Sequence, residues 1–293
     1  MNIAHTLQLG RIKAQKGKVM VLGQYLITFR EVLEAALITS MVLAYLARTG
    51  RNPLTRYVWY GVILSTAASV ALGATIWWTY GILPESTQVL FEGIAALIAV
   101  AVLSSMIYWM ATKGKELRAE VEKKVEILTT RGAVFGLVSF AFIAVFREGL
   151  ETVLFLTPYL VTDPAATVAG LLLGTLTSLA LAYVVFFVGK KINVRRFFYF
   201  TSILLVLLAG GLAGYGVHEL IEYTGSSVWG LLGQNAYALS ISPDNPFHHK
   251  GIIGSVFAVM FGYTVKAEWA RLIVHFVYLT VAIPLVVRVY RKR

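Results

Sequence analysis

The sequence predicts an all-α fold: a polytopic membrane protein with seven transmembrane helices, of which the first six form an inverted 3+3 helix repeat. Three observations lead to this prediction. Hydrophobic residues make up 58% of the 293 residues and charged residues only 14%, which is too apolar for a soluble domain of this size. Seven apolar runs alternate with short polar segments. A charged five-residue motif occurs twice, each time inside an apolar run.

Each apolar run is long enough for one crossing, because a helix needs about 20 mostly apolar residues to span a bilayer and a longer run can tilt. The predicted spans are residues 21–47, 57–82, 88–112, 132–161, 165–189, 197–217 and 269–290.

The charges between the runs predict the orientation. Seventeen Lys and Arg residues follow the first, third, fifth and seventh runs, whereas the opposite loops hold only Lys250 and Lys266. Because cytoplasmic loops carry the excess of basic residues, the basic side is predicted to be cytoplasmic. The sequence therefore predicts a multi-pass protein of the cell (plasma) membrane, with its N-terminus outside and its C-terminus in the cytoplasm.

The first 19 residues do not fit this pattern, since they carry four basic residues on the predicted outer side. They lack an apolar core of signal-peptide length. We interpret residues 1–19 as an N-terminal extension and Met20 as the start of the functional chain.

The apolar runs themselves repeat. The stretch GVILSTAASVALGATIWW from Gly61 matches GLLLGTLTSLALAYVVFF from Gly170 in length, in small residues and in aromatic ends. Each unit has three crossings, so the second copy must be inverted relative to the first. In transporters with inverted repeats, the substrate site lies near the bilayer midplane where the repeats meet.

This organisation divides the chain into six segments. They are an N-terminal extension (1–19), the first three-helix repeat (20–112), a cytoplasmic linker (113–131), the inverted second repeat (132–217), an external loop region (218–268), and the seventh helix with the basic C-terminus (269–293).

The first charged motif lies in FREVLEAAL, residues 29–37. On a helix, Glu31 and Glu34 share a face, and Arg30 can pair with Glu34 four residues later. The second motif, in FREGLETVL at residues 146–154, repeats this geometry with Arg147, Glu148 and Glu151.

Ionised side chains at the centre of a bilayer cost about 2.5–3.5 kcal/mol each on insertion scales. Six of them are therefore expected to face a protein interior or water and to have a function. If the repeats bring the motifs together, four carboxylates and two guanidinium groups share one site, and clustered carboxylate oxygens suit a hard cation. The alternative is that the motifs are ion-pair clamps that hold the bundle together.

Four further residues are candidate metal ligands: Glu92, His218, Glu219 and Glu222. Glu92 is interpreted as an ion relay, or as an acid that favours the N-terminal dipole of its helix. His218 and Glu222 have the four-residue spacing of a helical metal pair, which fits either a metal-receiving vestibule or a solvated helix end. The second His of the metalloprotease HExxH motif is absent, so this enzyme class is disfavoured.

Several classes of site are disfavoured by composition. There is no cysteine, which excludes disulfides and thiolate metal ligands. The net charge of +11 arises from the loops between apolar runs and is explained by topology, so we expect no nucleic-acid partner. No nucleotide-binding motif is present, and neither an organic cofactor nor catalytic residues are expected.

The two motifs resemble those of the oxidase-dependent iron permeases, a family that includes the fungal high-affinity iron permease and EfeU-type bacterial iron transporters. The likeness rests on paired Arg-Glu-x-Leu-Glu motifs in the first and fourth of seven helices, on FEGIAALIAVAVLSSMIYWM from Phe91, and on GVHELIE from Gly216. It runs across residues 20–290. The long segment NAYALSISPDNPFHHKGIIG and the N-terminal extension depart from the family pattern.

The resemblance implies a permease whose substrate is an iron ion, most simply ferric, and which passes it through the motif glutamates. An iron ion would meet Glu219 and Glu222 outside and then reach the carboxylates at the midplane. The expected partners are the metal ion, membrane lipid and an extracytoplasmic oxidase or metal-delivery protein, and a homo-oligomer stays open. The alternatives are a permease for another cation, such as lead or a divalent transition metal, a membrane metal-dependent enzyme, and a metal sensor.

Overall fold

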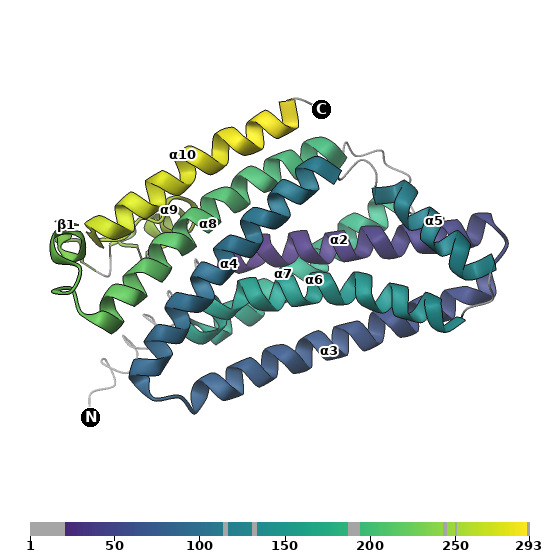
Figure 1. Ribbon diagram of the computed structural model, residues 1–293, viewed down its shortest axis with the longest axis horizontal. Coiled ribbons are helices and arrows are strands. Elements are labelled where there is room, and N and C mark those ends of the chain that lie inside the picture. Colours follow the sequence, from purple (N-terminus) through teal and green to yellow (C-terminus); the bar gives the residue numbers. More distant parts are fainter. Residues whose placement is uncertain are drawn as a thin grey trace.

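Helices make up most of the computed structural model (Figure 1), which describes residues 21–113, 117–130, 134–186, 194–242, 245–249 and 251–291. The described residues form nine α-helices, two short 3₁₀ helices and one two-stranded sheet. The all-α prediction is confirmed apart from this small sheet. Residues 1–20, which contain the predicted N-terminal extension, lie outside the described residues.

Seven long helices coincide with the seven predicted spans. They are α2 (Val21–Arg48), α3 (Thr55–Gly81), α4 (Glu85–Lys113), α6 (Val134–Thr162), α7 (Pro164–Phe186), α8 (Val194–Thr224) and α10 (Trp269–Arg291). The shorter elements are η1 (Asn52–Leu54), α5 (Leu117–Thr130), η2 (Gly230–Gly233), β1 (Asn235–Ala238), α9 (Ile252–Phe261) and β2 (Lys266–Glu268).

Local sequence signals explain several helix ends. Gly50 follows α2 with φ of 70°, and Gly225 follows α8 with φ of 84°, a backbone region that glycine enters without steric cost. At the start of α7, the Oδ1 atom of Asp163 accepts a hydrogen bond from the Ala166 N–H at 3.1 Å, and Pro164 occupies the first helical position, as is typical of helix N-termini.

Five segments are long and apolar enough to cross a membrane: Asn52–Gly81, Glu85–Thr112, Pro164–Val185, Phe198–Thr224 and Trp269–Arg291. Helices α2 and α6 have comparable lengths of 28 and 29 residues, which is about 42 Å at 1.5 Å per residue. They do not belong to this group of five, because each carries the three charged residues of one motif within its apolar stretch. The number of seven spans therefore stays a prediction.

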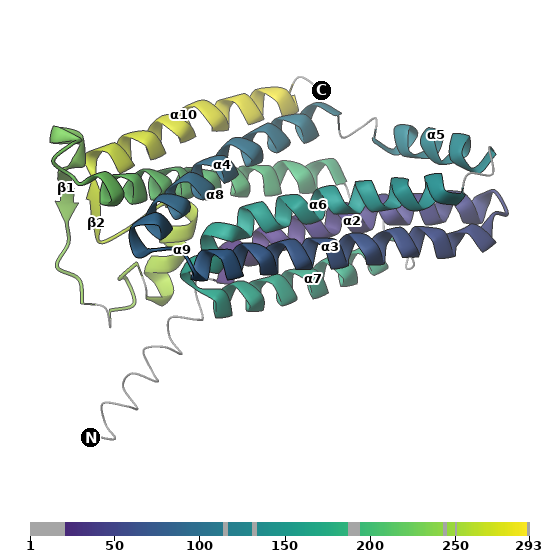
Figure 2. The ribbon, with the colours of Figure 1, turned by 60° about the horizontal axis from the view of Figure 1, so that its bottom comes forward.

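The helices pair between the two halves of the chain (Figures 1 and 2). Helix α2 packs along α7, α3 along α6, and α4 along α8, while α10 packs on α8. Helices α2 and α6 also contact each other, so the two motif-bearing helices are neighbours. The main core lies where α2, α4, α6 and α8 meet, with Ile27, Leu103, Phe155 and Leu205 at most 1% exposed.

Glycines allow two of these pairs to approach closely. A Cβ atom on Gly170 of α7 would lie 2.6 Å from the Cβ of Gln24, and one on Gly174 would lie 2.8 Å from the Cβ of Thr28. On the other pair, a Cβ on Gly61 of α3 would lie 2.8 Å from the Cβ of Ala141. Side chains at these positions would force the helices apart, as expected where small residues set helix contacts in membranes.

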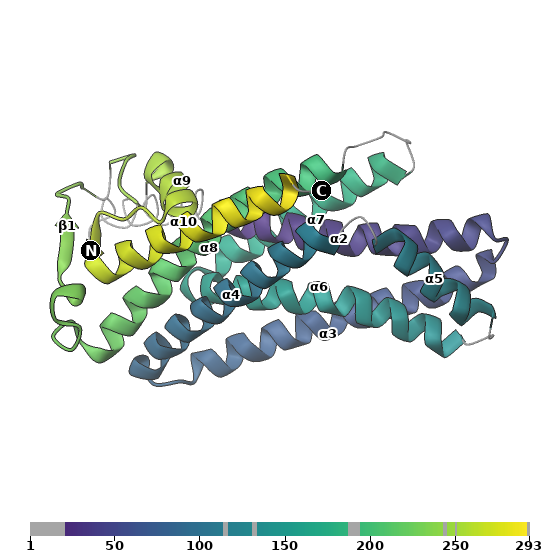
Figure 3. The ribbon, with the colours of Figure 1, turned by 45° about the horizontal axis from the view of Figure 1, so that its top comes forward.

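The two ends of the bundle differ (Figure 3). At one end, α5 packs on α2 and α6, with Val121 and Val125 buried against Leu46, and the Arg48 Nη2 atom lies 2.7 Å from the Glu122 Oε1 atom. The predicted linker 113–131 thus contains a packed helix. At the opposite end, β1 pairs antiparallel with β2, and Asn235 lies opposite Glu268.

Candidate metal-binding sites

The first motif lies near the middle of α2 and is buried. Arg30 is 1% exposed and is the largest of the fully buried side chains among the described residues. Its Nη1 atom donates to the Glu31 Oε1 atom at 2.8 Å, and its Nη2 atom lies 2.7 Å from the Glu34 Oε1 atom. One planar guanidinium therefore holds an oxygen of both carboxylates, a geometry that a lysine could not reproduce.

The second motif, on α6, has the same residue types in different surroundings. The Arg147 Nε atom donates to the Glu151 Oε1 atom at 2.9 Å, but the Arg147 side chain is 44% exposed. Glu148 is 3% exposed and Glu151 is 9% exposed. The two arginines therefore differ in exposure, although both pair with the glutamate four residues later.

The contact between α2 and α6 brings carboxylates of both motifs together. One ligand atom from each of Glu31, Glu148 and Glu151 lies within 4.8 Å of the others. Two oxygens that bind one cation at about 2.1 Å are at most about 4.2 Å apart, so a small movement of the side chains would let all three bind one ion. Glu34 is not in this group of three, and its carboxylate is held by Arg30.

The same carboxylates have unused oxygens. The Oε2 atoms of Glu31, Glu148 and Glu151 are buried and have no hydrogen-bond partner among the described residues. Buried polar atoms without partners cost free energy. A bound cation would remove this cost and would also offset the repulsion between the carboxylates.

Side chains of α4 contact both motif arginines. The Arg30 Nη1 atom contacts the Met106 Sδ atom, and the Arg147 Cζ atom lies 4.6 Å from the centre of the Trp109 ring. Met106 and Trp109 are three residues apart, so they lie on one face of α4. The Trp109 ring thus packs against a motif arginine.

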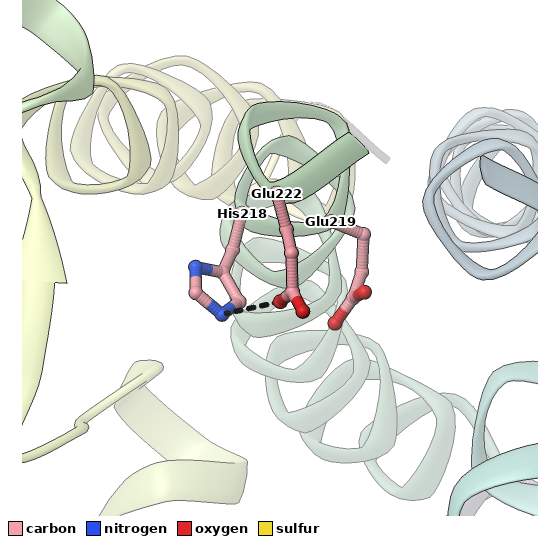
Figure 4. Close-up of side chains that lie close together, drawn as sticks. All are labelled: His218, Glu219 and Glu222. Carbon is pink, nitrogen blue, oxygen red and sulfur yellow. Dashed lines mark ion pairs between the residues drawn. The ribbon is translucent and has the colours of Figure 1, made fainter. Parts of the chain in front are cut away.

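A second group of candidate ligands lies near the C-terminal end of α8 (Figure 4). His218, Glu219 and Glu222 leave the helix on the same side, and one ligand atom from each lies within 4.8 Å of the others. The His218 Nε2 atom is 3.9 Å from the Glu222 Oε2 atom. On its other side, the His218 Nδ1 atom is 3.1 Å from the Oε1 atom of Glu268, a buried carboxylate on β2.

Glu92 accepts hydrogen bonds from two tyrosines and lies outside both groups of candidate metal ligands. The Tyr80 hydroxyl donates to the Glu92 Oε1 atom at 2.5 Å, and the Tyr215 hydroxyl donates to its Oε2 atom. Tyr215 lies on α8, one turn before His218 and Glu219. Glu92 therefore joins α4 to α8 one turn before the group formed by His218, Glu219 and Glu222.

Sequence reasoning did not find Met106, Tyr80, Tyr215 or Glu268 as members of these sites. The first three look like ordinary core or interface residues. The partners of Met106 and Tyr215 lie 76 and 123 residues away, and the partner of Tyr80 lies 12 residues later on the next helix. Glu268 is 50 residues from His218. The available signal was that Glu268 is an acid directly before the last apolar run.

Comparisons with known proteins show the family to which the chain belongs. The sequence profile of the family described as the iron permease FTR1 family matches residues 21–290. No solved structure matches the chain.

Three similar proteins cover most of the chain. An uncharacterised protein of Archaeoglobus fulgidus is 42% identical over 273 residues, which are 93% of this chain and 96% of the relative. The ferrous iron permease EfeU of Yersinia pestis is 33% identical over 88% of this chain and 90% of its own length. The protein of the same name from Escherichia coli O6:H1 is 34% identical over 88% of this chain and 92% of its own length. With five helices able to cross a membrane and this match across almost its whole length, the chain is a multi-pass membrane protein that belongs to the iron permease FTR1 family.

Proposed function

We propose that the chain is a permease that takes iron up into the cell, and that the iron ion passes through the carboxylates of Glu31, Glu34, Glu148 and Glu151. The observation that carries this proposal is the group of three buried carboxylates on α2 and α6, each with an unpartnered oxygen. An ion pair that served only as a clamp would not need these additional carboxylates. Membership of an iron permease family identifies the cation as iron.

The donor set fits this cargo. Carboxylate oxygens are hard, anionic ligands and favour hard cations. Four carboxylates and two guanidinium groups leave an excess of negative charge when all are ionised. In this proposal, Arg30 and Arg147 keep Glu34 and Glu151 in position and limit the repulsion in the absence of iron.

We further propose seven membrane spans with two inverted three-helix repeats. Helices α2 and α6 then add to the five spans that carry fewer charges, and the charges of α2 and α6 are tolerated because they lie against protein. The helix pairing supports this symmetry. In the proposed repeat, α2 corresponds to α6 and α3 corresponds to α7. The first helix of each repeat packs on the second helix of the other repeat, since α2 packs on α7 and α6 packs on α3. The excess of basic residues supports an external N-terminus and a cytoplasmic C-terminus.

The outer group is proposed to receive the ion. His218, Glu219 and Glu222 offer one nitrogen and two carboxylate donors at the end of α8 that faces outward in this topology. The Glu268 carboxylate beside the Nδ1 atom would orient the His218 ring, as carboxylates do for metal-binding histidines. Glu92 would act with this group as a further acid near the entrance.

Ferric iron is our first candidate for the transported ion, because the ligands are anionic oxygens. This candidate fits an extracytoplasmic oxidase or metal-delivery protein as partner. Ferrous iron is the second candidate, since the EfeU relatives are named ferrous iron permeases.

Uptake into proteoliposomes tests the proposal. Purified protein in sealed vesicles should accumulate ⁵⁵Fe, and parallel assays with ferrous iron under reducing conditions and ferric iron as a soluble chelate would identify the transported form. Competition by lead or divalent transition metals would test for a permease of another cation. Iron binding without accumulation would contradict transport and favour a sensor or a membrane enzyme.

A further inference from the structure

Two buried polar side chains on α2 have no partner. Gln24 and Thr28 are 0% exposed. Neither side-chain atom of the Gln24 amide, nor the Thr28 hydroxyl, has a hydrogen-bond partner among the described residues. Burying a polar group without a partner costs free energy, so these two positions are unfavourable unless another polar species is present.

The behaviour of other threonines makes Thr28 unusual. A helical threonine commonly satisfies its hydroxyl with the carbonyl oxygen four residues earlier. On α6, Thr152 bonds the Glu148 oxygen at 2.7 Å and Thr157 bonds the Val153 oxygen at 2.7 Å. Thr28 has no such bond, so its hydroxyl is available to a molecule or ion that the structure does not contain.

The position of both side chains relates them to the carboxylate site. Gln24, Thr28 and Glu31 follow at intervals of four and three residues, so they lie on one face of α2. Glu31 has an unpartnered oxygen of its own. Three consecutive turns of α2 therefore present unpaired oxygen or nitrogen atoms. The Cβ atoms of Gln24 and Thr28 lie against Gly170 and Gly174 of α7, and Glu31 belongs to the group of carboxylates.

The corresponding face of α6 differs. Ala141 and Val145 precede Arg147 by six and two residues, just as Gln24 and Thr28 precede Arg30. Both are buried and apolar, at 4% and 9% exposure. In the proposed topology, Gln24 and Thr28 lie on the external side of the α2 motif, and Ala141 and Val145 lie on the cytoplasmic side of the α6 motif. The site is therefore polar on its external side along α2 and apolar on its cytoplasmic side along α6.

Helix α4 does not offer an equivalent route. From Glu92 toward Met106, its buried positions are Gly93, Ala95, Ala96, Ala99 and Leu103, none of which has a polar side chain. An ion that left Glu92 along α4 would meet no donor before the motif arginines. The polar face of α2 is therefore the better candidate for the path between the outer end and Glu31.

We propose that Gln24 and Thr28 form an approach subsite for the cation, in which the amide and hydroxyl oxygens replace water of the hydration shell before the ion reaches Glu31. This inference rests on the proposed function. Neutral oxygens bind a hard cation less strongly than carboxylates do, so they can lower the cost of dehydration without retaining the ion. A path must bind an ion well enough for it to enter and weakly enough for it to leave.

Apolar substitution separates this role from a purely structural one. The variant Gln24→Leu/Thr28→Val removes polar atoms and keeps similar volumes. Replacing unsatisfied buried polar atoms by apolar ones is neutral or stabilising, so the melting temperature in detergent should stay the same or rise. Iron uptake per folded molecule should nevertheless fall tenfold or more, whereas Thr28→Ser, which keeps the hydroxyl, should retain uptake within about twofold.

The matched control is Thr157→Val. Thr157 lies nine residues after Glu148, hence on the opposite face of α6, and its hydroxyl is satisfied. It should change uptake less than twofold. If Gln24→Leu/Thr28→Val transports normally while Glu31→Gln does not, the approach subsite is wrong and the proposed function stands. If Glu31→Gln also transports normally, the proposed function itself has failed.

Thiol labelling tests the subsite without measuring transport. The chain contains no cysteine, so Thr28→Cys or Gln24→Cys introduces a single thiol. A cationic methanethiosulfonate reagent added to the outer side should label both variants and leave Thr157→Cys unlabelled, because only water-filled positions form the reactive thiolate. If Thr28→Cys and Gln24→Cys in the folded protein are as unreactive as Thr157→Cys, the face is dry and the inference is refuted.

Discussion

Neutralising one motif glutamate at a time should separate transport from stability. The variants Glu34→Gln and Glu151→Gln keep the side-chain volume and a hydrogen-bond acceptor but lose the anionic oxygen that a hard cation prefers. Both carboxylates pair with the arginine of their own motif, at 2.7 and 2.9 Å. The two arginines differ in burial, and Arg30 has a second carboxylate partner in Glu31.

The effect on stability should therefore differ between the two variants. Arg30 is 1% exposed, and removing one partner of a buried ion pair costs about 3–5 kcal/mol. We expect the lower end of this range for Glu34→Gln, because Arg30 still bonds Glu31. The Arg147 side chain is 44% exposed, so the loss for Glu151→Gln should be about 0–1 kcal/mol.

The effect on transport should be similar for both. A hydrogen bond or contact to a charged group contributes about 1.5–3 kcal/mol, which corresponds to roughly a 10- to 100-fold reduction in uptake. Residues that act in one site are not additive. The double variant Glu34→Gln/Glu151→Gln should thus be scarcely worse than either single variant.

The assay is ⁵⁵Fe uptake per folded molecule in proteoliposomes, measured beside thermal unfolding in detergent. Near-normal uptake by the folded double variant would refute the shared carboxylate site. A loss of uptake that merely followed the loss of stability, with Glu151→Gln almost unaffected, would favour the structural clamp.

Three further predictions concern other parts of the molecule. Trp109→Leu removes a cation–π contact with Arg147 worth about 0.5–2 kcal/mol, so iron uptake should fall several-fold. Trp109→Phe keeps an aromatic ring and should keep most of the uptake. An equal loss of uptake in both variants would show that the ring does not act through the arginine. His218→Ala should raise the iron concentration for half-maximal uptake and leave the maximal rate within about twofold, and a reduced maximal rate at unchanged half-saturation would contradict a receiving role. A reporter fused after Arg293 should be cytoplasmic and one inserted at Asn245 external, and finding both on one side would exclude the proposed seven-span topology.

The positions of the long helices could be predicted because their cause is local. Apolar runs bounded by basic or Gly- and Pro-containing segments specify membrane helices, whatever lies beside them. The end of α8 was predicted less well. Residues 218–224, HELIEYT, are polar enough to suggest a loop, but the helix continues to Thr224, and His218 meets the carboxylate of Glu268.

The two motifs could be recognised from their charge, but their surroundings could not. Nothing local distinguishes Arg30 from Arg147, although one is buried and the other is half exposed. Their difference comes from α4, whose Met106 and Trp109 lie far away in the sequence and resemble common membrane residues. The unpaired state of Gln24 and Thr28 is likewise visible only when every neighbouring helix is in place.

The pairing of helices across the halves has a consequence for biosynthesis. Helix α2 packs along α7, and its charged motif meets the carboxylates of α6, yet both partners are translated more than a hundred residues later. The first half is therefore synthesised with the ion pairs of Arg30 to Glu31 and Glu34 available on α2 itself, but without the carboxylates of α6 and without the packing surface of α7. Either the translocon retains α2 until the second half emerges, or the first helix inserts only after α6 and α7 have been made. Truncated chains that end before α6 should for this reason be poorly inserted into the membrane and rapidly degraded. When the two halves are produced together as separate chains, each should stabilise the other against degradation.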